Sequence, residues 1–200
     1  MKFIKLKDIA EVRTGLTTLR KKAEKFSEDI EKYNQLNLKC LDSEGCFYAE
    51  NTDVFESQEK LDDKYFTKKD DIIVRLREPV SAALIKENEE RLLIPSYFAV
   101  IRLKNKEQYK PEYITAVINS SIGKRYFSKY INMSGISILK STFLKDLEVL
   151  NMNLRNQEIF IKILELKKRE MFLIEELKKE KENIYKYIEN RILNGEHNEN

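Results

Sequence analysis

The stretch "LKDLEVLNMNLRNQEIFIKIL" (residues 144–164) changes character halfway along and decides how the rest of the chain is interpreted. It opens with a short β-type run, Leu147–Leu150, passes through a run rich in asparagine, and then becomes apolar at helical spacing. Asn153 or Asn156 is a suitable N-cap for a helix that starts here. The pattern predicts one helix of about 38 residues within the segment 153–194, where the average helix has roughly 11–12.

This helix has an apolar stripe that its own domain is too small to cover. Apolar side chains recur at Ile159, Phe160, Ile163, Leu164, Leu166, Leu173, Ile174, Leu177, Ile184, Ile188 and Ile192. A helix of this length spans about 57 Å at 1.5 Å per residue. We therefore expect the stripe to meet a second helix, from another copy or another protein, in the manner of a coiled coil. The residues expected at that contact are Ile163, Leu166, Leu173, Leu177, Ile184 and Ile188. The alternative is that the helix folds back over its own domain.

Residues 1–152 mix strand and helix patterns, which predicts one α+β domain in front of the helix. Three runs rich in β-branched and aromatic residues, "DIIVRLR" (71–77), "VSAALIK" (80–86) and "YFAVIRLK" (97–104), predict strands. The spacing of apolar residues predicts a helix over 111–130, and composition favours another over 19–35. Residues 195–200 are expected to be a disordered tail.

The net charge of +3 is small but unevenly distributed along the chain. Residues 1–23 hold seven basic and two acidic side chains, and residues 91–150 hold ten and four, whereas residues 24–90 hold ten and eighteen. Two basic segments that meet on one face would form an electrostatic footprint for phosphates. The alternative is a chance scatter in a chain with 36% charged residues.

The sequence offers no set of residues suited to catalysis or to a metal. His197 is the only histidine and lies in the polar tail, and Cys40 and Cys46 are the only cysteines. No glycine-rich phosphate loop occurs, and no apolar run approaches the roughly 20 residues of a membrane span. We therefore expect a binding protein and not an enzyme, without cofactor or metal, located in the cytoplasm with reduced cysteines and no membrane partner.

Basic and small polar residues gather in three loop regions and are the candidates for contact with double-stranded DNA. They are Arg13, Thr14, Thr17, Lys68, Arg75, Arg77, Lys124, Arg125, Lys129, Ser134, Ser137 and Lys140. Lysine and arginine neutralise phosphates, while hydroxyl groups and arginine also bond base edges. Each region alone is equally typical of an ordinary solvated loop.

Four segments, taken in order, resemble the specificity subunit of a type I restriction-modification enzyme in a half-length form. They are "FIKLKDIAEVRTGLT" (3–17), "YFTKKDDIIVRLR" (65–77), "IPSYFAVIRLKN" with "YKPEYITAVINSSIGKRYF" (94–105 and 109–127), and "GISILKSTFLKDLEVLNMNLRNQEIFIKIL" (135–164). Each motif is degenerate, so the resemblance lies in their order and spacing. This chain departs from the pattern at Asp70, where a glycine is usual, and at the junction before the helix, where prolines are usual but only Gln157 remains.

The resemblance implies a target-recognition domain over 1–152 and a long spacer helix over 153–194. Complete specificity subunits have two such domains and two such helices, and they direct methyltransferase subunits, and a restriction subunit where there is one, to a split DNA target. By this resemblance the chain is a noncatalytic DNA-binding subunit that forms a homodimer or pairs with a second specificity chain. The alternative is a protein-interaction module or decoy that engages modification subunits through its helix without reading DNA.

Overall fold

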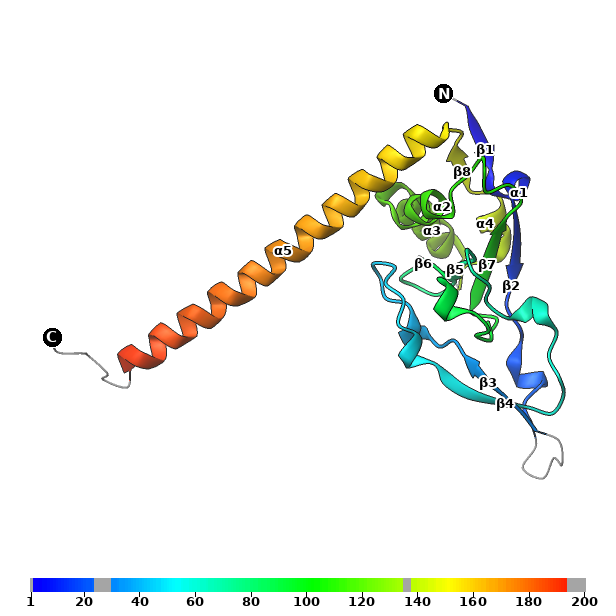
Figure 1. Ribbon diagram of the computed structural model, residues 1–200, viewed down its shortest axis with the longest axis horizontal. Helices are drawn as coiled ribbons and strands as arrows, with labels where there is room; N and C mark the ends of the chain where they lie inside the picture. The colour runs from blue at the N-terminus through cyan, green and yellow to red at the C-terminus, as the bar shows by residue number, and fades with distance from the viewer. Residues whose placement is uncertain (1, 24–29, 135–137, 194–200) are drawn as a thin grey trace. The chain divides into compact units, whose positions relative to one another are not determined.

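The computed structural model describes residues 2–23, 30–134 and 138–193, and for residues 132–134 the backbone alone (Figure 1). The chain divides into two compact units, residues 1–158 and 159–200. The first unit contains β1 (Phe3–Lys5), α1 (Leu6–Ile9), β2 (Ala10–Thr14), β3 (Glu31–Gln35), β4 (Asp53–Ser57), β5 (Ile72–Arg75), β6 (Ser81–Leu84), β7 (Phe98–Leu103), α2 (Pro111–Asn119), α3 (Ser121–Ser134), α4 (Ser141–Lys145) and β8 (Glu148–Leu150). Helix α5 (Leu154–Leu193) starts there and forms the described part of the second unit. The fold is α+β with a long C-terminal helix, as the sequence predicts.

A four-stranded antiparallel sheet is the centre of the first unit, with strand order β2-β7-β5-β6 (Figure 1). Strands β5, β6 and β7 are the predicted strands, and nearly every residue in them is buried. Because both faces of the sheet are covered, these strands are continuously apolar and do not alternate with polar residues.

Cross-strand pairing assigns each residue to one face of this sheet. Val100 lies opposite Ile73, and Ile73 lies opposite Ala83, so these three share a face. That face packs against Leu36 and Ile94 in one core cluster. Helices cover the other face, where α2 contacts β6 and α4 contacts β2. Loops therefore cover one side of the sheet and helices the other.

Residues 111–130 form two helices, so the single helix predicted there is wrong. The chain turns at Ser120, which has extended backbone angles (φ −66°, ψ 162°). Its Oγ donates to the carbonyl of Val117 at 2.7 Å and accepts the N–H of Gly123 at 3.2 Å, which caps α3. A Cβ on Gly123 would lie 2.3 Å from the carbonyl oxygen of Ile118. The corner between α2 and α3 therefore requires glycine at this position.

The helix predicted over 19–35 is also wrong. A short 3-10 turn covers Thr18–Arg20, residues 24–29 lie outside the described chain, and β3 follows. Strand β3 pairs with β4, which the sequence analysis missed, and the ring of Tyr33 lies 5.1 Å from that of Phe66. Strand pairing and aromatic packing outweigh a helix propensity that amounts to a few tenths of a kcal/mol per residue.

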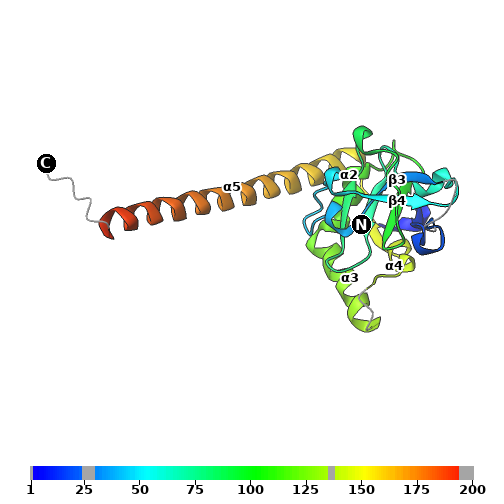
Figure 2. The same ribbon diagram turned by 90° about the horizontal axis from the view of Figure 1, so that it is seen from below.

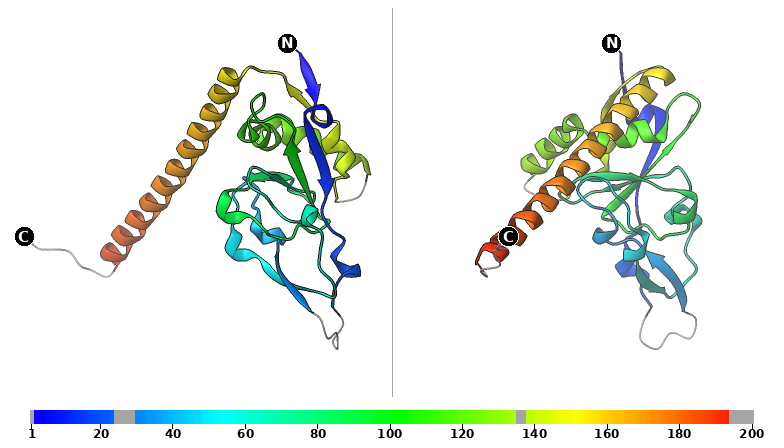
Figure 3. Two further views of the ribbon diagram at one scale, coloured as in Figure 1. Left: turned by 45° about the vertical axis from the view of Figure 1, so that its right-hand side comes forward. Right: turned by 60° about the vertical axis from the view of Figure 1, so that its left-hand side comes forward.

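Strands β1 and β8 pair and bring the start of the chain beside the start of α5 (Figure 3). Asn153 caps α5 by accepting the N–H of Asn156 at 2.9 Å, so the cap is the first of the two candidates. The helix has 40 residues and begins and ends within one residue of the predicted bounds. The tail predicted to be disordered lies outside the described residues.

The side chain of Gln157 fastens the first turn of α5 to the first unit. It is fully buried, its Oε1 accepts the N–H of Lys110 at 2.9 Å, and its Nε2 donates to the carbonyls of Gln108 and Met152 at 2.8 and 2.9 Å. A buried amide that satisfies three backbone groups is a strong local constraint. Gln157 therefore fixes the position of the first turn of α5 on the first unit.

Candidate nucleic-acid interface

The first predicted group lies on β2 and the segment after it, and its one cation, Arg13, is half-buried and paired. The Nε of Arg13 lies 2.9 Å from a carboxylate oxygen of Glu11, while Thr14 and Thr17 are exposed. Gly15 lets this segment approach the chain at 94–95, because a Cβ there would lie 2.3 Å from the carbonyl oxygen of Ile94. The two threonines are thus presented to solvent on a backbone held close to the domain.

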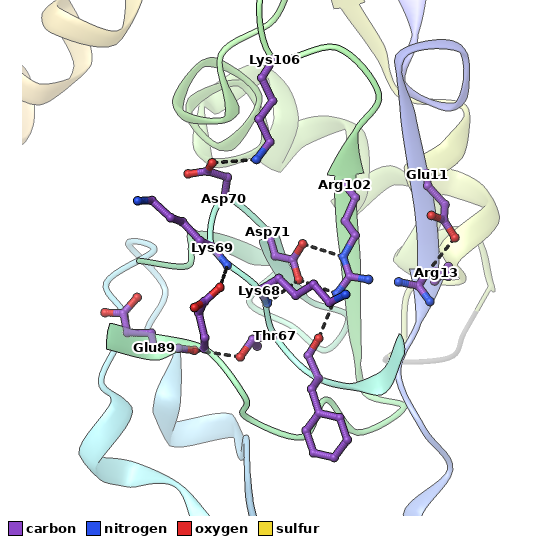
Figure 4. A network of polar contacts seen from close by, with 12 residues as sticks. Glu11, Arg13, Thr67, Lys68, Lys69, Asp70, Asp71, Glu89, Arg102 and Lys106 are labelled. Carbon is purple, nitrogen blue, oxygen red and sulfur yellow. Dashed lines mark hydrogen bonds and ion pairs between the residues drawn. The ribbon is translucent and has the colours of Figure 1, made fainter. Parts of the chain in front are cut away.

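A charge network surrounds the next predicted residue, Lys68 (Figure 4). Asp71 is buried and accepts two hydrogen bonds from Arg102, at 2.7 and 2.8 Å, and another from the backbone N–H of Lys68. Lys106 pairs with Asp70 at 2.7 Å. Because most cations here have a carboxylate partner, the network stabilises the fold and offers little free positive charge. The side chain of Lys68 itself is exposed.

Arg75 is used inside the domain, which the sequence analysis did not foresee. Its NH1 donates to the carbonyls of Leu38 and Leu41 at 3.4 and 3.3 Å, and its NH2 donates to that of Glu78 at 3.2 Å. Its side chain is half-buried on the loop-covered face of the sheet, beside Phe98. Arg75 therefore holds the 38–41 turn in place, and we leave it out of the set proposed to face DNA.

The remaining basic candidates come from three segments that the fold places next to one another. Arg77 forms a β-bridge with Ile138, and the N–H of Leu139 donates to the carbonyl of Leu76 at 2.7 Å. Lys140 follows directly at the start of α4. Helix α3, which precedes this segment in the chain and ends at Ser134, contains Lys124, Arg125 and Lys129. We call Arg77, Lys124, Arg125, Lys129 and Lys140 the α3 basic surface.

An aromatic cluster joins α3 to α4, which lie side by side in Figure 2. The ring of Tyr130 stacks on Phe143 at 4.2 Å and lies 4.8 Å from Tyr126, whose hydroxyl donates to the carbonyl of Phe143 at 3.0 Å. The cluster fixes α3 relative to the start of α4, and so fixes the spacing of the basic side chains on both. Composition alone did not reveal this role of the tyrosines.

The α3 basic surface has little compensating negative charge. Residues 113–145 contain five lysines or arginines and no aspartate or glutamate. Lys124 lies 3.2 Å from Glu44. Within the described chain, Arg77, Arg125, Lys129 and Lys140 form no ion pair, and all four are exposed. Ser137 and the side chain of Ser134, also predicted here, lie outside what the structure describes.

The α3 basic surface and the β2 group are both arranged around the central sheet. Strands β2 and β6 are the two opposite edges of the central sheet. Helix α2, which leads into α3, contacts β6. Lys124 on α3 pairs with Glu44. The next residue, Gly45, lies close to β6, because a Cβ added to it would be 2.6 Å from the carbonyl oxygen of Ala82. Arg13, Thr14 and Thr17 lie at or beyond the other edge. Lys140 of the α3 basic surface lies at the start of α4, which contacts β2, so a single DNA-binding set stays a prediction.

Cys40 and the acidic side chains of the described residues do not form a site of another kind. Burial raises the pKa of the Cys40 thiol, which keeps it protonated and unreactive near neutral pH. The described residues contain no group of three or more metal-ligating side chains. No helix in the described ranges is long and apolar enough to cross a membrane.

Comparisons with known proteins find no matching family model and no matching curated protein. Solved structures do match. A chain from a study of complex assembly and conformational transition of the type I R-M system aligns with TM-score 0.64 and 12% identity, over 96% of this chain and 44% of that one. The HsdS subunit from Thermoanaerobacter tengcongensis aligns with TM-score 0.63 and 13% identity, over 94% of this chain and 46% of that one.

The chain has the fold of one half of a type I restriction-modification specificity subunit. It spans less than half the length of the solved chains that it matches. At 12–13% identity the likeness establishes the fold alone. The family resemblance read from the four motifs is confirmed at that level, including the α+β domain and the long helix after it.

Proposed function

We propose that this chain is a noncatalytic, DNA-binding specificity subunit of a type I restriction-modification system. Residues 1–152 would form the target-recognition domain and residues 153–194 the spacer helix. The observation that carries the proposal is an alignment over 94–96% of the chain to specificity-type structures, with the domain and the helix in the same order. Methyltransferase subunits, and a restriction subunit where one exists, would be directed to the DNA target by this chain.

The α3 basic surface is the part of the domain that we assign to the DNA backbone. Four exposed cations without a carboxylate partner among the described residues, in a region free of acidic side chains, suit a line of phosphates. Base reading is assigned to the hydroxyl residues of the predicted set, namely Thr14, Thr17, Ser134 and Ser137. Arg13, which is half-buried and paired with Glu11, and Lys68, which is exposed, are further phosphate candidates.

Helix α5 supplies the argument for a second chain. Every residue from 165 to 190 is exposed, and Ile163, Leu166, Leu173, Leu177, Ile184 and Ile188 are each 45–57% exposed. An apolar stripe of this length is not stable in water without a partner. A second copy would supply a second recognition domain and a second helix at once, and closed two-fold symmetry is the commonest oligomeric arrangement.

The salt dependence of duplex binding tests this function. The full chain, with modification subunits present, should lose duplex affinity as salt rises, with a slope of about −0.9 per phosphate contacted. Replacing Arg125 and Lys129 with alanine should reduce that slope by about 2 and weaken all duplexes about equally. Lys60→Ala is the matched control, because Lys60 is exposed but lies in the acidic segment.

The same salt titration of duplex binding tests a second candidate function, that of a protein-interaction module. A protein-interaction module or decoy would bind modification subunits through α5 and show no duplex binding at any salt concentration. The exposed stripe on α5 is the observation that favours this candidate, because it requires a partner but not DNA. Assembly with modification subunits but without any duplex affinity would overturn the DNA-binding proposal.

A further inference from the structure

The stripe on α5 reads almost the same in both directions. The row of the stripe at spacings of three and four, which leaves out Phe160, Leu164 and Ile174, forms pairs that lie equally far from residue 175, to within one position. The apolar pairs are Leu173 with Leu177, Leu166 with Ile184, Ile163 with Ile188, and Ile159 with Ile192. One position corresponds to about 1.5 Å along a helix, which side chains easily accommodate. A stripe with this symmetry matches a copy of itself that runs in the opposite direction.

Two charged residues interrupt the stripe, and they form a matched pair as well. Glu170 and Lys181 lie five and six positions from residue 175, on opposite sides of it. Both continue the spacing of three and four, since Glu170 stands between Leu166 and Leu173, and Lys181 stands between Leu177 and Ile184. Both side chains are exposed, and neither forms an ion pair with any residue that the structure describes.

We propose that two copies of α5 pair antiparallel in a single register centred near residue 175, with Glu170 of each copy against Lys181 of the other. This inference rests on the proposed self-association and adds its direction, its register and its charged contact. In this register every apolar member of that row meets an apolar residue. The two-fold axis produces the Glu170–Lys181 contact twice, once at each side of the centre.

The charges also select against the competing arrangement. In a parallel pair in register, Glu170 would face Glu170 and Lys181 would face Lys181, so both contacts would be repulsive. Charged or polar residues at such positions specify register and orientation in coiled coils, at some cost in stability. A shift of one heptad in the antiparallel pair would place each of these charges against an apolar residue. The register centred near residue 175 is the arrangement that avoids both penalties.

Charge reversal in the full-length chain tests the register. Glu170→Lys and Lys181→Glu should each raise the dimer Kd about tenfold, because two attractive contacts become two repulsive ones. The double variant E170K/K181E should recover the wild-type Kd to within about twofold, because it restores both contacts with reversed sign. Mixing the two single variants should give a heterodimer of wild-type affinity. Sedimentation equilibrium measures each Kd, and circular dichroism checks that α5 keeps its helix content.

The outcomes separate the register from the self-association on which it depends. A wild-type chain that stays monomeric at all concentrations would overturn both. A wild-type dimer that neither single substitution weakens would overturn this register and direction while leaving the dimer intact. Weakening in the single variants without recovery in the double variant would also overturn it, since the substitutions would then act on the helix and not on the contact.

Discussion

At the residue scale, the backbone conformation of Asp70 explains how aspartate can stand where the specificity-subunit pattern has glycine. Its φ is +67°, a left-handed conformation that glycine adopts freely and that aspartate tolerates better than most residues. The backbone therefore turns here as it would with the usual glycine. The carboxylate that comes with the substitution pairs with Lys106 at the surface. The sequence shows that Asp70 replaces the usual glycine, and the positive φ shows why aspartate is tolerated at this position.

Substitution of Asp70 should show that backbone conformation matters more than the side chain. Asp70→Gly should leave the free energy of unfolding unchanged or raise it by up to about 1 kcal/mol, because the left-handed strain is relieved. Asp70→Ala should lower it by about 1 kcal/mol. Urea unfolding of the two variants measures both. If the glycine variant were as unstable as the alanine variant, the ion pair with Lys106 and not the turn would be what matters.

Gln157 is the residue where the structure adds most to what the sequence reveals. A glutamine in the first turn of a helix is ordinarily a solvent-exposed residue, and no local pattern identifies this one as fully buried. Its three hydrogen-bond partners come from the segment before α2 and from the segment before α5. Such a contact depends on the tertiary fold, so it could not be predicted.

Gln157→Leu should lower the free energy of unfolding by about 3 kcal/mol, because one amide N–H and two carbonyls are left buried without partners. Hydrogen exchange should also become faster in the first turn of α5. Asn156→Ala is the control, since the side chain of Asn156 is exposed and its change should cost under about 1 kcal/mol. Equal stability in the two variants would show that Gln157 does not fasten the helix.

At the element scale, local periodicity predicted what local interactions determine. Strands β5, β6 and β7 and the helix α5 were predicted because long apolar runs and a regular stripe identify them. Strand β3 was missed because its stability comes from pairing with β4. The corner at Ser120 was missed because it depends on a close approach at Gly123 that a helical period does not reveal. Of the candidate site, the charges were predictable, but the internal use of Arg75 was not.

The stripe on α5 should be needed for assembly and not for folding. Replacing both Leu173 and Leu177 with aspartate puts four charges at the centre of the proposed dimer, which should abolish self-association. The first unit should keep its thermal transition, because these side chains are more than half exposed and lie in the second unit. Sedimentation velocity gives the assembly size, with Lys178→Ala as a control. An unchanged size would exclude the stripe as the contact.

At the scale of the whole molecule, the chain spans less than half the length of the solved chains with its fold. The proposed two-fold dimer would add a second domain and a second helix. It would present two identical recognition domains. Paired half-sites on DNA mirror the symmetry of the protein that binds them. The proposed target is therefore an inverted repeat with a gap whose length depends on α5.

The measurement that tests this account most directly is the selection of preferred targets from random duplexes, with modification subunits present. It compares the full chain with a variant that lacks residues 173–179, one heptad of α5. The deletion preserves the phase of the stripe and removes about 10 Å of helix, or about three base pairs at ~3.4 Å each. We predict an inverted-repeat target for both proteins, with a gap about three base pairs shorter for the variant. An asymmetric target, or a gap that ignores the length of the helix, would contradict the account.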